Sequence, residues 1–295
     1  MPKTKFGPWV MLSSLVLSSC GGGGGSPDTA VPAITSVSVS PTSNGQITLT
    51  AAATDNTGVA GYCFKSSVTA PLATDACFQA SPSTSVTKPQ QNAIYVWAKD
   101  AAGNISTAQA AGCSAAGISA SQASALPTVC VSSSLGQFVL ELESTKAPVT
   151  SANFLKYVND GYYSQTVFHR VMANFMVQGG GFTGVPIAAA NAKAGTVYPA
   201  IALETPANTG LSNTVGTIAM ARTSVLNSAT SQFFINVVDN TALDTNGGGY
   251  AVFGRVISGM DTTIQSIRNV PVQSNGSEVS QPLTPPSVAW AYALK

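Results

Sequence analysis

Short apolar segments separated by turn-forming residues run through most of this 295-residue chain. Residues 34–39, 46–51, 61–65 and 93–98 are rich in β-branched or aromatic side chains, and Pro, Asn, Asp and Gly cluster between them. Short runs of this kind, bounded by turn residues, predict strands, and many of them in series are typical of a β-sandwich. We therefore predict a small β-sandwich domain over residues 31–113.

A second set of strands follows residue 128, together with two helical segments. Pro148 suits the first turn of a helix, and Phe154, Leu155 and Val158 follow it with helical spacing. A second short helix is expected near Met260 to Ile267. Strands are expected at residues 137–143, 166–171, 175–178, 217–221, 233–238, 251–257 and 287–294.

This pattern predicts a mainly β fold with two domains. Residues 128–295 would form a closed antiparallel β-barrel capped by two helices, and the small β-sandwich would precede it. Residues 114–127 are rich in Ser and Ala and lack hydrophobic periodicity, so we predict a linker there.

The first twenty residues have the features of an export signal. Lys3 and Lys5 precede a mostly apolar segment, residues 6–17, which is too short to cross a bilayer as a helix. The following Leu-Ser-Ser-Cys resembles the bacterial lipobox. This resemblance implies a lipoprotein signal peptide over residues 1–19 and acylation of Cys20.

The glycine-rich residues 20–30 predict a flexible tether behind the acylated cysteine. We expect a lipid-anchored protein of the bacterial cell envelope, attached to a membrane through this N-terminal anchor. By resemblance to bacterial lipoproteins, Gly21 in place of Asp favours the periplasmic side of the outer membrane.

Four cysteines remain after Cys20, and in an exported protein they indicate disulfides. Four cysteines allow three connectivities. Cys63 and Cys77 are the natural first pair because both lie in the predicted β-sandwich. Cys113 and Cys130 flank the predicted linker and could join the two domains.

Charge and composition argue against several classes of function. Only 8% of the residues are charged, the formal net charge is +1, and no long basic run is present, so we expect no nucleic-acid partner. The sequence has one histidine, His169, and no Cys-x2-Cys spacing, so we expect no metal site and no cofactor. It also lacks the Gly-x-Ser-x-Gly motif of a serine hydrolase.

Three blocks in the C-terminal part resemble the cyclophilin family. They are FHRVMANFMVQGG at residues 168–180, GTIAMARTSVLNSATSQFFINVVDN at residues 216–240, and YAVFGRV at residues 250–256. Their order and spacing agree with that family over residues 128–295. The resemblance implies peptidyl-prolyl cis–trans isomerase activity on proline-containing polypeptides, without a cofactor.

The same resemblance implies roles for individual residues. Arg170 would be the catalytic hydrogen-bond donor, Gln178 would hold the substrate backbone, and Gln232 would support that arrangement. Ala221 and Arg222 would line the groove for the residue before proline. Tyr250 stands where many eukaryotic members carry His. The proline ring would enter an apolar pocket formed by Phe175, Met176, Phe234 and Leu243.

Two alternatives stay open at this stage. The stretches TDNTGVAGYCF and YVWAKDAAGNIS resemble bacterial immunoglobulin-like repeats, and that domain could be a spacer or a module that recruits substrates. The C-terminal domain could also bind prolyl peptides without turnover, as a chaperone or a surface adhesion protein. An isomerisation assay separates that possibility from an enzyme.

Overall fold

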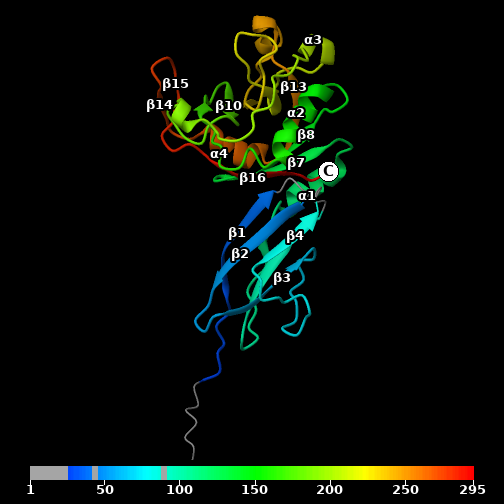
Figure 1. Cartoon of the computed structure of the whole chain (residues 1–295), viewed down its shortest axis with the longest axis vertical. Helices are drawn as coiled ribbons and strands as arrows, with labels where there is room; N and C mark the ends of the chain where they lie inside the picture. The colour runs from blue at the N-terminus through cyan, green and yellow to red at the C-terminus, as the bar shows by residue number, and fades with distance from the viewer. Residues whose placement is uncertain (1–25, 42–45, 88–91) are drawn as a thin grey trace, which may run out of the picture.

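The computed structural model describes residues 26–41, 46–87 and 92–295 (Figure 1). Cys20 and the predicted signal peptide lie outside these residues. No helix in the described ranges is long and apolar enough to cross a membrane.

The N-terminal domain consists of two three-stranded antiparallel sheets. One contains β1 (Ala33–Pro41), β2 (Gln46–Thr54) and β4 (Ser83–Thr87), in the order β1-β2-β4. The other contains β3 (Val59–Lys65), β5 (Tyr95–Asp100) and β6 (Gln109–Ala110), in the order β3-β5-β6. The predicted strands of this region are therefore present, whereas its immunoglobulin-like topology stays a prediction.

The core of the N-terminal domain follows from strand periodicity. Ile47, Leu49 and Ala51 alternate along β2 and are buried, because successive side chains of a strand point to opposite faces. They share one hydrophobic cluster with Val96 of β5. Cys63 is bonded to Cys77, as the sequence predicted.

The predicted linker at residues 114–127 contains a helix, α1 (Ala115–Ala123), which the sequence analysis did not predict. The Ser114 hydroxyl caps the helix by accepting from the Gly117 amide, which satisfies one free N–H of the first turn. Ile118 is its main buried apolar residue, which explains why hydrophobic periodicity gave no signal. The second disulfide, Cys113–Cys130, ties the start of this helix to the next strand.

The C-terminal domain is built on one eight-stranded antiparallel sheet, in the order β16-β7-β8-β13-β11-β12-β10-β9. These strands are β7 (Thr128–Ser133), β8 (Gly136–Leu142), β9 (Arg170–Val171), β10 (Met176–Gly179), β11 (Thr217–Met220), β12 (Phe233–Asn236), β13 (Val252–Ser258) and β16 (Val288–Ala293).

The predicted closed barrel is not confirmed. Within the described residues the edge strands β9 and β16 do not pair with each other. The segment before β9 meets the start of β16 through a bridge between Val167 and Ser287 and through backbone hydrogen bonds of residues 165–168 with Pro286 and Val288. The sheet is therefore curled, but strands β9 and β16 form no ladder that would close it into a barrel. A separate hairpin, β14 (Val272–Ser274) and β15 (Val279–Pro282), lies beside β9.

Two helical segments pack against the sheet at the positions predicted from the sequence. α2 (Pro148–Asn159) begins with proline at its first position, and its Phe154 contacts the rings of Phe233 and Phe253. The second predicted helix is one wide turn, Met260–Ile264, that continues into α4 (Gln265–Arg268). A short helix, α3 (Pro206–Thr209), lies in a long connection.

The two domains share buried apolar side chains. Trp290 and Tyr292 of β16 belong to the same hydrophobic cluster as Ile47 and Leu49 of the N-terminal domain. The Tyr292 hydroxyl accepts a hydrogen bond of 2.8 Å from the backbone amide of Cys113. Burial raises the pKa of Tyr292 to about 12. Figure 1 shows β16 and α1 facing the ends of β1 and β2 at this contact.

Candidate active site

Strand register places four residues side by side across the sheet. Arg170 of β9 is paired with Gln178 of β10, Gln178 is paired with Phe234 of β12, and Phe234 is paired with Ala219 of β11. Directly paired residues point to the same face of a sheet. The pairing thereby places Arg170 and Phe234, which are 64 positions apart in the sequence, on one surface.

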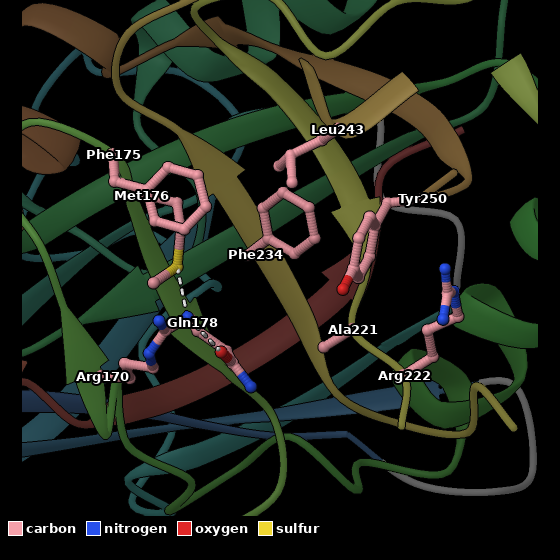
Figure 2. Close-up of a pocket in the computed structure, with 9 residues that line it drawn as sticks. All are labelled: Arg170, Phe175, Met176, Gln178, Ala221, Arg222, Phe234, Leu243 and Tyr250. Carbon is pink, nitrogen blue, oxygen red and sulfur yellow. Dashed lines mark hydrogen bonds between the residues drawn. The ribbon is translucent and has the colours of Figure 1, made fainter. Parts of the chain in front are cut away.

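A pocket of about 210 Å³ opens on this surface (Figure 2). It is lined by nine of the residues that the sequence predicted for the site: Arg170, Phe175, Met176, Gln178, Ala221, Arg222, Phe234, Leu243 and Tyr250. Gln232, the remaining predicted residue, does not line the pocket, but its side-chain oxygen accepts a hydrogen bond from the Gln178 amide. The structure therefore brings all the predicted substrate-binding residues together.

The pocket has an apolar floor. Met176 and Phe234 are 1% and 5% exposed, and with Ala219 and Val252 they form a hydrophobic cluster of their own. The Tyr250 ring meets the Phe234 ring edge-on, with centroids 5.9 Å apart. Such a floor suits a small apolar ring, because burial of apolar surface favours its binding.

The connection after β12 forms another side of the pocket. Leu243 lies on the short helical turn Thr241–Asp244. The side-chain amide of Asn240 donates to the Phe175 carbonyl at 2.8 Å and to the side-chain oxygen of Asn236 at 2.7 Å. These bonds fix the backbone on both sides of the apolar floor.

Arg170 is held at the rim by a carboxylate. Its Nε and Nη2 donate to the two oxygens of Glu278, at 2.5 and 2.8 Å, in a bidentate pair. Hydrogen bonding by Arg170 lowers the pKa of Glu278 to about 2, so this carboxylate is ionised at any ordinary pH. The Arg170 Nη1 lies on the pocket side, 3.5 Å from the Gln178 Oε1.

The two glutamines form a chain beside this arginine. The Gln178 Nε2 donates to the Gln232 Oε1 at 3.0 Å. Gln232 thus orients the Gln178 amide so that its oxygen faces Arg170.

Arg222 lines the pocket, but its guanidinium is engaged by the protein itself. It donates to the carbonyls of Thr223, Gly247 and Gly249 at 2.6–3.1 Å and lies 4.4 Å from the centre of the Tyr250 ring. Gly247, like Gly249, has a positive φ, which glycine adopts without strain. Within the described residues no carboxylate pairs with Arg222, so it leaves a net positive charge beside the pocket.

Glu278 was not identified from the sequence. It lies in the turn of the β14–β15 hairpin, 108 residues after Arg170. The sequence analysis predicted neither β14 nor β15 as a strand. The only local signal is the turn formed by Asn275, Gly276 and Ser277, which predicts a hairpin tip but not its partner.

A candidate cation site lies elsewhere. Among the described residues, the carboxylates of Asp28, Asp55 and Asp100 approach one another within 4.8 Å. Hydrogen bonds from Asn56, Thr57, Gly58, Gly103 and Asn104 engage most of their oxygens. This group belongs to the N-terminal domain and has no residue in common with the pocket.

Comparison with known proteins agrees with the geometry. The family model described as cyclophilin type peptidyl-prolyl cis-trans isomerase/CLD matches residues 128–288. A peptidyl-prolyl cis-trans isomerase of Acinetobacter baylyi is 47% identical over 154 residues, which are 51% of this chain and 77% of that protein.

Two further relatives are similar over half of the chain or more. Peptidyl-prolyl cis-trans isomerase cyp18 of Streptomyces antibioticus is 44% identical, over 57% of this chain and 99% of its own length. Peptidyl-prolyl cis-trans isomerase B of Escherichia coli is also 44% identical, over 50% of this chain and 87% of its own length. The chain belongs to the cyclophilin family of peptidyl-prolyl cis–trans isomerases, and its isomerase domain includes residues 128–288.

Proposed function

We propose that this isomerase acts on X–Pro bonds of exported proteins and that Arg170 stabilises the twisted amide. The observation that supports this most strongly is the position of Nη1 of Arg170, at the rim of an apolar pocket and free of the carboxylate that holds the other side of the guanidinium.

The reaction sets clear demands on the catalyst. Rotation about a peptide bond has a barrier of ~18–20 kcal/mol, because the C–N bond has partial double-bond character. No covalent bond is made or broken, so neither a nucleophile nor a metal is required. The enzyme must instead bind the twisted amide more tightly than either planar isomer.

A fixed cationic donor meets this demand. In the planar amide the nitrogen lone pair is delocalised, whereas in the twisted amide it is localised and accepts a hydrogen bond. A donor aimed at that nitrogen therefore stabilises the transition state selectively. Lowering the barrier by about 7 kcal/mol corresponds to roughly 10⁵-fold acceleration. The Arg170 guanidinium stays protonated at ordinary pH, so it remains a donor.

The other pocket residues receive roles from the same arrangement. The proline ring packs on Met176 and Phe234, with Phe175 and Leu243 at the sides. Gln178, oriented by Gln232, binds the substrate backbone next to the reacting bond. Ala221, Arg222 and Tyr250 border the groove for the residue that precedes proline.

The role of Arg170 is tested by separating binding from turnover in the full-length mature chain. Arg170→Ala should reduce kcat for a single-proline peptide far more than it weakens peptide binding, because the hydrogen bond forms only in the twisted state. The dissociation constant is measured by calorimetry and kcat by exchange NMR. Equal losses in affinity and kcat/KM, with kcat unchanged, would assign Arg170 to substrate binding alone.

Location in the cell envelope is the second part of the proposal. The lipobox-like sequence before Cys20, the glycine tether and the four paired cysteines all suit an exported protein. Attachment to a membrane would place the enzyme near newly exported polypeptides.

Cys20→Ser tests this location. The variant should remain unprocessed or appear in the soluble fraction, because acylation requires the cysteine thiol and stable anchoring needs more than one acyl chain. Membrane fractionation and mass spectrometry of the N-terminus give the readout. A wild-type protein with an unacylated mature N-terminus would contradict the proposed anchor.

A further inference from the structure

The pair formed by Arg170 and Glu278 constrains the arginine at the pocket rim. Arginine is a long side chain with several rotatable bonds, and an unpaired arginine at a pocket rim loses rotamer freedom when it binds a reacting group. Here two of its nitrogens are already engaged by one carboxylate. A bidentate pair fixes the plane of the guanidinium as well as its position.

We propose that Glu278 is a positioning residue for the isomerisation reaction: its carboxylate holds the Nε and Nη2 side of Arg170, so that Nη1 faces the proline pocket. This inference rests on the role proposed for Arg170. Glu278 does not line the pocket, and it acts through Arg170.

Glu278 is itself held firmly. The hydroxyl of Ser280, which is fully buried, donates to the Glu278 Oε1 at 2.6 Å. The backbone amide of Glu278 donates to the Asn275 side chain at 3.0 Å, and its carbonyl accepts from the Asn275 amide at 3.0 Å. The tight turn of the hairpin therefore fixes the carboxylate before any substrate arrives.

The environment also limits other positions of Arg170. Its Nη2 lies 3.5 Å from the sulfur of Met172 and its Nη1 lies 3.9 Å from the sulfur of Met176. These are weak acceptors compared with a carboxylate. Among the described residues, Glu278 is the one carboxylate paired with Arg170, so no second acid replaces it.

A role in stability alone would give a different pattern of effects. The side chains of Arg170 and Glu278 are 28% and 25% exposed, and ion pairs with access to water contribute little to folding. Preorganisation of a donor acts instead on the transition state. Loss of Glu278 should therefore reduce turnover more than it reduces stability.

The test compares Glu278→Gln with the parent and repeats the comparison in an Arg170→Ala background, using the full mature chain. Glu278→Gln should lower kcat/KM about tenfold, equivalent to about 1.4 kcal/mol of transition-state stabilisation. In the Arg170→Ala background the same change should alter the residual kcat/KM by less than about twofold, because a residue that acts through Arg170 has nothing left to position.

Glu141→Gln is the matched control. Glu141 pairs with Arg255 at 2.9 Å in the same sheet and lies outside the pocket, so its loss removes an equal charge without changing the site. Its kcat/KM should stay within about twofold of the parent. Glu278→Asp keeps the negative charge on a shorter side chain, and its kcat/KM should lie between those of the parent and of Glu278→Gln.

A structural readout is independent of activity. The Arg170 Nε–H resonance should shift and exchange faster in Glu278→Gln, since its acceptor is changed. A Glu278→Gln variant that remains folded and retains parental kcat/KM overturns the inference. An equal loss in both backgrounds also overturns it, since Glu278 would then act without Arg170. If Arg170→Ala itself leaves turnover intact, the role proposed for Arg170 fails first.

Discussion

At the scale of single residues, the site is a row of paired positions on one face of a sheet. Arg170, Gln178, Phe234 and Ala219 occupy neighbouring strands in register, so the donor, the amide and the apolar floor are placed by backbone pairing. The sequence motifs could identify these residues because they lie within short blocks. Glu278 could not be found in this way, since its partner is 108 residues away and its hairpin has no family motif.

His169 provides a prediction at the same scale. It is 2% exposed, its Nδ1 has no hydrogen-bond partner, and burial lowers its pKa to about 4. The unfolded chain, with a histidine pKa of ~6.5, therefore binds more protons than the folded chain between about pH 4 and 6.5. His169 should thus make the free energy of unfolding fall as the pH is lowered through this range, by about 1.4 kcal/mol per unit of pKa difference.

The measurement is unambiguous because the sequence contains one histidine. Proton NMR of its ring gives the pKa directly, and denaturant unfolding of the parent and of His169→Gln gives the stability at each pH. The parent should lose more stability than the variant on acidification. A titration midpoint near 6.5 would show that the ring is hydrated and not buried as described.

At the scale of elements, strands were predicted well where apolar and polar residues alternate, and helix α2 was predicted from its proline and apolar stripe. Helix α1 was missed because Ser and Ala dominate it and little of its surface is apolar. Its position depends on a serine cap and on the Cys113–Cys130 disulfide, both of which act through distant or backbone partners. Hydrophobic periodicity along the chain cannot predict contacts of this kind.

Removal of the Cys113–Cys130 disulfide tests the structural role of this helix. The two cysteines are 17 positions apart, and a loop of this size contributes ~3 kcal/mol in the chain-entropy model. Cys113→Ser with Cys130→Ser should lower the free energy of unfolding by about this amount while kcat/KM stays within about twofold. Neither cysteine lines the pocket, so turnover should be spared.

The control is Cys63→Ser with Cys77→Ser, which opens a loop of similar length inside the N-terminal domain. Both double variants are compared by denaturant unfolding and by isomerisation of the same peptide. A large loss of kcat/KM in the Cys113 and Cys130 variant alone would show that helix α1 communicates with the active site.

At the scale of the whole molecule, the two domains are joined by more than a covalent connection. Trp290 and Tyr292 of the isomerase domain are buried against the N-terminal sheet, and a hydrogen bond and a disulfide lie next to them. The sequence predicted two domains and their order, but the contact depends on residues near both ends of the chain. Any assay on residues 128–295 alone would expose this apolar surface, so the full mature chain is the appropriate material.

The most direct test of the central claim is the cis–trans exchange rate of a single-proline peptide with the full mature chain and its Arg170→Ala variant. The account predicts that the variant remains folded and loses at least about a hundredfold in kcat/KM, equivalent to about 2.7 kcal/mol. Arg255→Ala removes another paired guanidinium, outside the pocket, and should retain parental activity within about twofold. A folded Arg170→Ala variant within a few-fold of the parent would contradict the account.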